Sequence, residues 1–196
     1  MITILIMMIM GNQNIMKKNC KIGISWCSPK IESKDSNVSG KGVFAKETVR
    51  KGELVAVFGG FIIHMNQLDT LEKESPDSFQ TILEVGYQID DELIISPISR
   101  DQFSHIEYLN HSCDANCGFV DQLHLVAIRN IEKGEELHMD YATCITSEIF
   151  EMPCNCGASM CRKTLSAHDW QNTEVQNKYF EYFQPFIKKK IINTKV

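Results

Sequence analysis

The sequence has no excess of positive charge. Its 20 Lys and Arg residues are outnumbered by 25 Asp and Glu residues, which gives a formal net charge of −5 at pH 7. Direct binding to nucleic acid through a broad basic face is therefore not expected. An acidic surface suits a basic partner instead, such as a lysine-rich peptide.

Long hydrophobic segments are also missing. The apolar stretch MITILIMMIM at residues 1–10 is too short to span a bilayer, and it lacks the basic region and the small-residue cleavage site of an export signal. We interpret residues 1–18 as an apolar leader or a mis-assigned start, and we predict no membrane span. An intracellular, soluble protein is expected: nuclear and chromatin-associated if the source is eukaryotic, cytoplasmic or delivered to a host if it is bacterial.

Without an export signal, the eight cysteines are not expected to form a disulfide framework. Three of them crowd into CNCGASMC at residues 154–161. Cys154 and Cys156 would point to opposite sides of a regular strand, so binding one ion requires a tightly curled loop, which Gly157 allows. Structural zinc takes four ligands. The spacing leaves three candidates for the fourth ligand: Cys113, Cys117 and Cys144.

No long amphipathic helix dominates the chain. Short apolar runs separated by turn residues predict a mainly β domain, and these runs are KGVFA, ELVAVF, FIIH, TILEV, ELIIS, LHLVAI and ELHMDY. Residues 75–78 are predicted as a loop, residues 100–110 as a short helix and residues 172–183 as helical. Residues 44–58 and 126–141 echo each other around a Lys-Gly-Glu sequence, and Gly52 and Gly134 are expected to turn the chain there.

Residues 110–117, NHSCDANC, concentrate amide, imidazole, hydroxyl, carboxylate and thiol groups in eight positions. SGKGVFA at residues 39–45 matches neither a P-loop nor a dinucleotide-binding fingerprint. Its two glycines predict a turn before a strand, at which the backbone can approach a ligand closely. GEELHMDYA at residues 134–142 reads as a strand ending in Tyr141.

Taken in order, GKGVFA, NHSCDANC, GEELHMDY and CNCGASMC resemble the SET-domain protein lysine methyltransferases that carry a post-SET zinc segment. The resemblance covers the chain from Ser39 to Cys161. It implies small curved sheets with a pseudoknot, a zinc-binding post-SET loop and short helices. The expected divisions are an N-terminal flank at 19–38, the SET domain at 39–145, the post-SET segment at 150–166 and a partly helical tail at 167–196.

The resemblance also implies roles for individual residues. Tyr141 is the expected catalytic residue. S-adenosylmethionine is the expected cofactor, contacting Gly40, Lys41, Gly42, Asn110, His111 and Tyr141. Side chains of Phe58, Phe119 and Met139 are expected along the substrate channel. One Zn²⁺ is expected on Cys113, Cys154, Cys156 and Cys161.

Several positions depart from the family pattern. Phe58 stands where a tyrosine is common, and Met139 stands where a phenylalanine or tyrosine is usual. The lead-in to the NHSC motif is EYL rather than an arginine and an aromatic residue, and Ala115 replaces the usual proline. The expected function is methylation of a lysine in a protein substrate, with a histone as one candidate. The alternative is a catalytically weak SET module that binds a basic protein without turnover. A monomer is expected.

Overall fold

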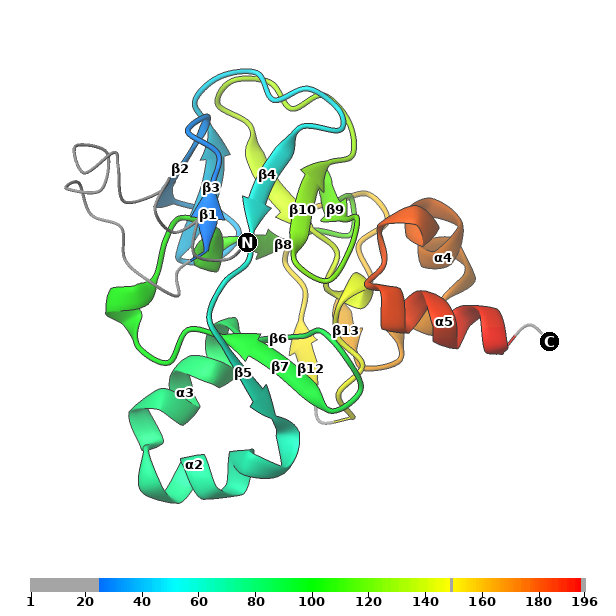
Figure 1. Ribbon diagram of the computed structural model, residues 1–196. Helices are drawn as coiled ribbons and strands as arrows, with labels where there is room; N and C mark the ends of the chain where they lie inside the picture. Colours follow the sequence, from blue (N-terminus) through cyan, green and yellow to red (C-terminus); the bar gives the residue numbers. More distant parts are fainter. Residues whose placement is uncertain (1–24, 149, 195–196) are drawn as a thin grey trace, which may run out of the picture.

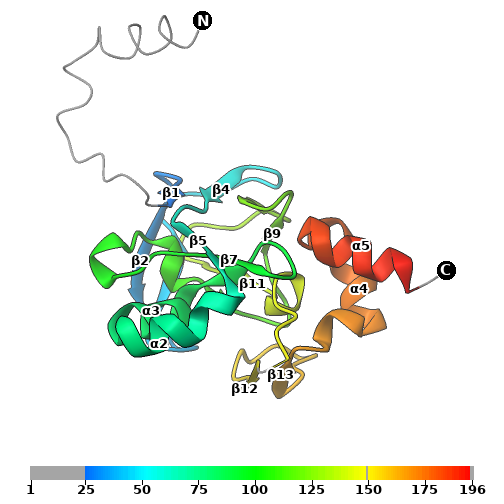
Figure 2. The ribbon, with the colours of Figure 1, turned by 60° about the horizontal axis from the view of Figure 1, so that its bottom comes forward.

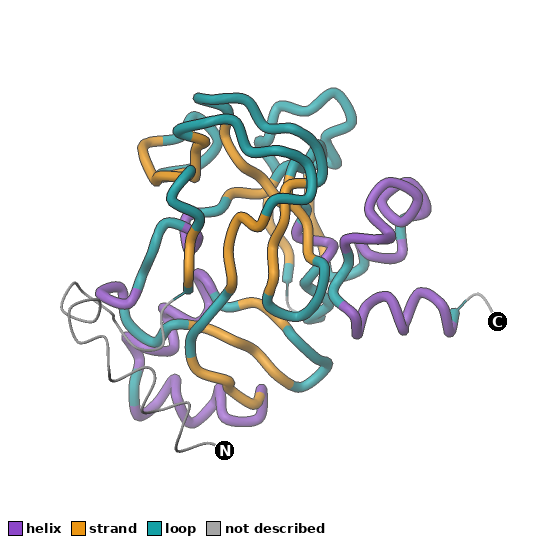
Figure 3. Tube along the Cα trace, turned by 45° about the horizontal axis from the view of Figure 1, so that its top comes forward, coloured by secondary structure: helices purple, strands orange, loops and turns teal. Residues whose placement is uncertain are grey.

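The computed structural model describes residues 25–148 and 150–194, so the interpretation of residues 1–18 as a leader lies outside the described residues (Figure 1). The fold is mainly β, as predicted, with short helices at the periphery (Figure 3). No helix in the described ranges is both long and apolar enough to cross a bilayer.

The largest sheet has eight strands, and the N-terminal flank provides both of its edges. The order is β1 (Trp26–Cys27), β4 (Leu54–Val57), β10 (His124–Ala127), β9 (Cys117–Phe119), β11 (Glu136–Met139), β3 (Lys41–Ala45) and β2 (Ile31–Asp35), and β8 (Asn110–His111) pairs with β11. The strands β1 and β2 precede the boundary expected at residue 39 and extend the sheet that the residues after it form.

The two echoing segments lie side by side. Val49 and Ile131 form an antiparallel bridge with hydrogen bonds in both directions. The N–H of Gly52 donates to the carbonyl of Ala127, and the N–H of Gly134 donates reciprocally to the carbonyl of Ala45. Both glycines have positive φ, +83° and +86°, as expected for a turn that a side chain would strain.

A three-stranded sheet with the order β5 (Phe61–His64), β7 (Leu93–Ser96) and β6 (Tyr87–Gln88) lies below the large one, next to α2 (Leu68–Glu74) and α3 (Pro76–Val85) (Figure 1). The predictions of a loop at 76–78 and a strand at TILEV were wrong, because these residues belong to α3, while Ser75 lies between α2 and α3 as expected for a loop. Pro76 occupies the first turn of this helix, where a missing N–H costs nothing, and Ile82 faces the interior.

The chain after residue 150 forms a hairpin and a helical tail on one side of the domain (Figure 2). Strands β12 (Glu151–Pro153) and β13 (Thr164–Ser166) pair, and α4 (Thr173–Tyr179) and α5 (Pro185–Asn193) follow. The predicted helical tail is confirmed. The predicted helix at 100–110 is instead two single 3₁₀ turns, η2 (Arg100–Gln102) and η3 (Ile106–Tyr108).

Candidate functional site

The octet 110–117 crosses the end of β11. One edge of β11 pairs with β3 and then, in parallel, with β8, while its other edge pairs with β9. Asn116 fixes this crossing, because its amide oxygen accepts the N–H of His138 at 2.8 Å and its amide nitrogen donates to the carbonyl of Glu136 at 2.8 Å. These two hydrogen bonds join residues 22 and 20 positions apart in the sequence.

Asn110 joins this crossing to the glycine-containing turn. Its side-chain nitrogen lies 3.3 Å from the carbonyl oxygen of Ser39, 3.0 Å from that of Lys41 and 2.9 Å from Oε1 of Glu136. Gly40 has φ of +46°, and a Cβ built there would meet no atom within 4 Å. The candidate cofactor segments are therefore adjacent, with open space beside Gly40 that a ligand can occupy.

Glu136 has a role that the sequence did not indicate. Its carboxylate accepts hydrogen bonds from Asn110 and from the Ser36 hydroxyl, the latter at 2.8 Å. A Cβ on Gly42 would lie 2.1 Å from Oε1 of Glu136. Gly42 therefore makes room for the carboxylate that holds Asn110.

Tyr141 opens the 3₁₀ turn η4 (Tyr141–Thr143), directly after β11. Its hydroxyl donates to the carbonyl of Leu109 at 3.1 Å, and its N–H donates to Nδ1 of His111 at 3.2 Å. Burial, with a smaller contribution from Cys144, raises the pKa of Tyr141. The hydroxyl therefore stays protonated at physiological pH and can act as a hydrogen-bond donor.

A cavity of about 530 Å³ reaches Tyr141. Phe58, Met139 and Leu109 line it together with Tyr141, and so do residues of α3, β6 and β12. Neither Asn110 nor residues 40–42 line this cavity. It therefore offers a passage to Tyr141 that is separate from the candidate cofactor segments.

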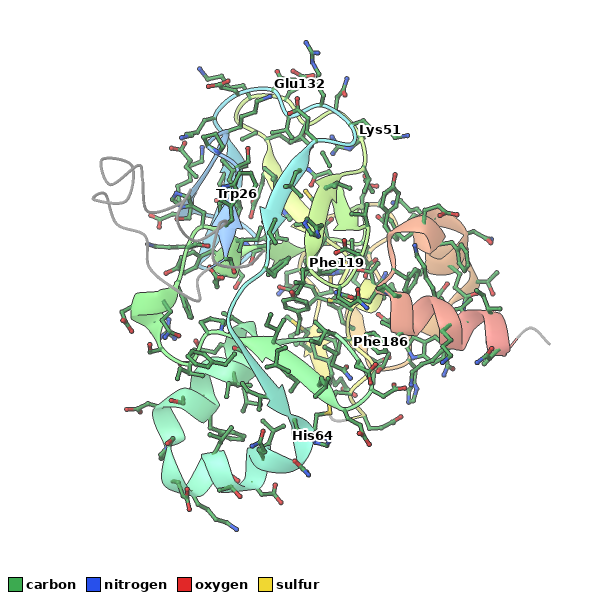
Figure 4. All side chains as sticks on the ribbon, in the orientation of Figure 1. Trp26, Lys51, His64, Phe119, Glu132 and Phe186 are labelled. Atoms are coloured by element: carbon green, nitrogen blue, oxygen red, sulfur yellow. The ribbon has the colours of Figure 1, made fainter. Side chains whose placement is uncertain are left out.

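The aromatic residues that line the cavity are not all the ones expected from the sequence. Phe119 is fully buried and does not line the cavity; it packs behind Phe58, with ring centroids 5.6 Å apart, and lies in the middle of the molecule (Figure 4). Tyr87 does line it, 4.5 Å from the Phe58 ring, although nothing in the sequence singled it out. Its hydroxyl donates to the carbonyl of Gln122 at 3.5 Å.

Four cysteine thiols gather where the octet meets the loop between β12 and β13. Sγ of Cys154 lies 3.9 Å from Sγ of Cys113 and 3.6 Å from Sγ of Cys161. Cys156 approaches from the same loop, with Sγ 3.5 Å from the N–H of Cys113. Four thiolates at the usual zinc–sulfur distance would be about 3.8 Å apart in a tetrahedron, and the two separations from Cys154 are close to that value.

His111 is a fifth potential ligand. Its side chain, with those of Cys113, Cys154 and Cys156, offers ligand atoms that all lie within 4.8 Å of one another. Its Nε2 lies 3.3 Å from Sγ of Cys113, and burial lowers the pKa of His111 to about 4, so the ring is neutral near pH 7. Because Nδ1 accepts the N–H of Tyr141, the ring proton is on Nε2 and points to the Cys113 sulfur.

The thiols differ in acidity. Burial raises the pKa of Cys113 to about 11. Burial also opposes ionisation of Cys156, yet hydrogen bonds from the N–H groups of Cys113 and Ala158 lower its pKa to about 6. The other two sequence candidates, Cys117 and Cys144, are fully buried in the main hydrophobic core.

The SET-domain family model matches residues 40–142, more than half of the sequence. The chain belongs to the SET-domain family.

Two curated relatives illustrate the similarity. The chain is 32% identical over 141 residues to histone-lysine N-methyltransferase 2B of Homo sapiens, covering 67% of this chain and 5% of that protein. It is 32% identical over 159 residues to histone-lysine N-methyltransferase Su(var)3-9 of Drosophila melanogaster, covering 70% of this chain and 25% of that protein. The chain thus spans a small part of these relatives.

Solved structures share the fold. The methyltransferase domain of human SETMAR superposes with a TM-score of 0.53 at 20% identity, over 68% of this chain and 56% of that one. KRYPTONITE in complex with mCHG DNA and SAH also gives a TM-score of 0.53, at 26% identity, over 68% of this chain and 28% of that one.

Proposed function

We propose that this chain is a protein-lysine methyltransferase that uses S-adenosylmethionine. The observation that carries the proposal is the convergence at the end of β11. Asn110 donates to the carbonyl of Lys41 in the glycine-containing turn, and Tyr141 lines the cavity of about 530 Å³. The names of the relatives, which are histone-lysine N-methyltransferases, support the same reaction.

Bound S-adenosylmethionine would supply an activated methyl group on a sulfonium. In the proposal, Gly40–Gly42, Asn110 and His111 hold the cofactor, and the cavity admits the lysine side chain. A free lysine has a pKa of about 10.4, and burial in an apolar cavity lowers it, so the amine can lose its proton before it attacks. The Tyr141 hydroxyl would orient the amine, since alignment is the main requirement of such a displacement.

The aromatic walls of the cavity give it a second function. Phe58 and Tyr87 present ring surfaces that can guide the alkyl part of the lysine and stabilise a methylated ammonium. The fully buried Phe119 would support these rings from behind rather than contact the substrate.

One zinc ion on Cys113, Cys154, Cys156 and Cys161 would fix the hairpin β12–β13 to the octet. The two sulfur separations from Cys154 support this set. The Nε2–H group of His111 would then donate a hydrogen bond to the Cys113 thiolate. Such a partner holds a metal-binding thiolate in position.

The substrate is proposed to be a lysine-containing protein, with a histone as the first candidate, and a nuclear location would follow for a eukaryotic source. Binding without turnover is less favoured, because Tyr141 and an accessible cavity are both present. A monomeric state stays a prediction.

The decisive experiment supplies S-adenosylmethionine with a labelled methyl group, together with a panel of histones and other proteins, and identifies the product by mass spectrometry. Tyr141→Phe removes the hydroxyl and keeps the ring, and we expect its rate to fall by roughly 10²–10³. Zinc and cofactor binding should be unchanged. If the unaltered protein transfers no methyl group, the proposed function is contradicted. If Tyr141→Phe keeps full turnover, the role of Tyr141 is contradicted.

A further inference from the structure

Arg162, the residue after Cys161, forms an ion pair with a carboxylate buried next to Tyr141. Its two terminal nitrogens donate to the two oxygens of Asp140, at 2.6 and 2.7 Å. The Asp140 side chain is fully buried, and the Arg162 side chain is 14% exposed. Arg162 Nε lies 2.7 Å from the carboxylate of Asp169. A bidentate pair of this kind fixes orientation as well as distance.

Asp140 sets the geometry of η4. Its carboxylate accepts the N–H of Ala142 at 3.0 Å, and its carbonyl accepts both the N–H and the hydroxyl of Thr143, at 2.9 and 2.7 Å. Tyr141 lies between Asp140 and these two residues. A displacement of the carboxylate would therefore move the turn that carries Tyr141.

The backbone of Arg162 contacts the thiol cluster. Its N–H points to Sγ of Cys113 at 3.4 Å. Arg162 thus touches the cluster with its main chain and Asp140 with its side chain. Within the described residues, this is a short physical connection between the cluster and the turn of Tyr141.

We infer that Arg162 is a positioning residue that holds Tyr141 in register with the thiol cluster. The inference rests on the proposed methyl transfer. A purely structural role is the competing explanation: in it, Arg162 only attaches the β12–β13 hairpin to Asp169 in η5 (Asp169–Gln171). In the inference, methyl transfer depends on the ion pair of Arg162 with Asp140. In the competing explanation, Arg162 acts only through its ion pair with Asp169.

The test compares Arg162→Lys with Asp169→Asn. Lysine keeps the charge but cannot span both oxygens of Asp140, whereas Asp169→Asn leaves the bidentate pair intact. For Arg162→Lys we expect kcat to fall at least tenfold, because an error near 1 Å in a catalytic group can cost about 10² in rate. Its KM values and zinc content should stay within threefold of the unaltered protein. Asp169→Asn should keep kcat within threefold.

Arg50→Lys is the matched control, since Arg50 is exposed and lies in the turn around Gly52, outside the lining of the cavity and outside the thiol cluster. A second readout needs no activity. In protein labelled with 3-fluorotyrosine, the ¹⁹F signal of Tyr141, assigned by its loss in Tyr141→Phe, should shift in Arg162→Lys and stay in place in Arg50→Lys.

An unmoved signal, a fall in kcat of less than tenfold or a loss of zinc in Arg162→Lys would overturn the inference. An equal loss of kcat in Asp169→Asn would do the same. If Arg162→Lys does not fold, the charge-free double variant R162Q/D140N replaces it, and the same outcomes apply. If the unaltered protein transfers no methyl group, the proposed function fails, and the ¹⁹F signal alone decides the inference.

Discussion

Met139 occupies the point where β11 meets β8 on one edge and β9 on the other, and its side chain lines the cavity. It is flexible and apolar, and it offers no hydroxyl to hold a water beside the amine. A methylated amine then has room to rotate and react again. We expect the unaltered protein to form di- or trimethyl-lysine and Met139→Tyr to shift the product towards monomethyl-lysine, measured by mass spectrometry.

Met160→Tyr is the control for this prediction, because Met160 is 67% exposed and does not line the cavity. It should leave the product unchanged. Strictly monomethylated product from the unaltered protein would show that Phe58 or Tyr87 narrows the channel instead.

Gly42 gives a second prediction for single residues. A Cβ there would push Glu136 away from Asn110, so Gly42→Ala should weaken cofactor binding at least tenfold in calorimetry. Gly52→Ala is the matched control: its positive φ makes it destabilise the fold by about 1 kcal/mol, yet Gly52 has no contact with Glu136. Unchanged cofactor binding by Gly42→Ala would place the cofactor elsewhere.

At the residue scale, the motifs selected side chains that lie close together in the structure, and their functional roles stay predictions. Asn110, Tyr141 and the four cysteines were selected from the sequence, and the structure brings them to one region. Glu136 and Tyr87 were missed, because a surface-like glutamate and an isolated tyrosine gain their roles only when distant strands pair. Phe119 was expected along the channel but packs behind Phe58, because the pairing of the strands decides which aromatic side chain faces the cavity.

At the scale of elements, α4 supports the octet from behind. The Tyr179 hydroxyl accepts the N–H of Ala115 at 2.7 Å and donates to the carbonyl of Cys113 at 3.2 Å. Tyr179→Phe removes the acceptor of the Ala115 N–H, while the carbonyl of Cys113 keeps the Lys178 ammonium at 3.3 Å, so we expect a loss of about 1–3 kcal/mol in unfolding free energy. Chemical denaturation would measure it.

Tyr182→Phe is the matched comparison for Tyr179→Phe. The Tyr182 ring packs against Gly118, and the structure shows no hydrogen bond of its hydroxyl to another described residue. Tyr182→Phe should lower the free energy of unfolding by less than about 0.5 kcal/mol, as is typical of a substitution outside a buried network. Equal losses in the two variants would contradict the role given to the Tyr179 hydroxyl.

Elements were predicted correctly where their period was clear. The strands around Val43, Val55 and Leu125 follow short apolar runs, and the structure confirms them. TILEV failed because a run of five residues fits a strand or a helix equally well. The proline at the start of α3 and the packing of Ile82 decided for the helix.

At the scale of the whole molecule, the thiol cluster brings the octet 110–117 together with the loop between β12 and β13, about forty residues later in the sequence. If the proposed zinc ion is bound, its removal with a chelator should loosen the β12–β13 hairpin and the segment around Arg162, while the eight-stranded sheet stays folded. Hydrogen exchange should show faster exchange at 150–170 and little change in β4, β10 and β11. The variant Cys113→Ser should bind less zinc and show the same pattern. Purified, active protein without zinc would contradict this prediction.

The position of the N-terminal strands at the two edges of the large sheet has a consequence for folding during synthesis. Without β9, β10 and β11, the remaining strands form two separate pairs, β1–β4 and β3–β2. Two-stranded ribbons are marginally stable by themselves. The strands that emerge first from the ribosome therefore stay in such pairs until β11, which ends at Met139, has also emerged.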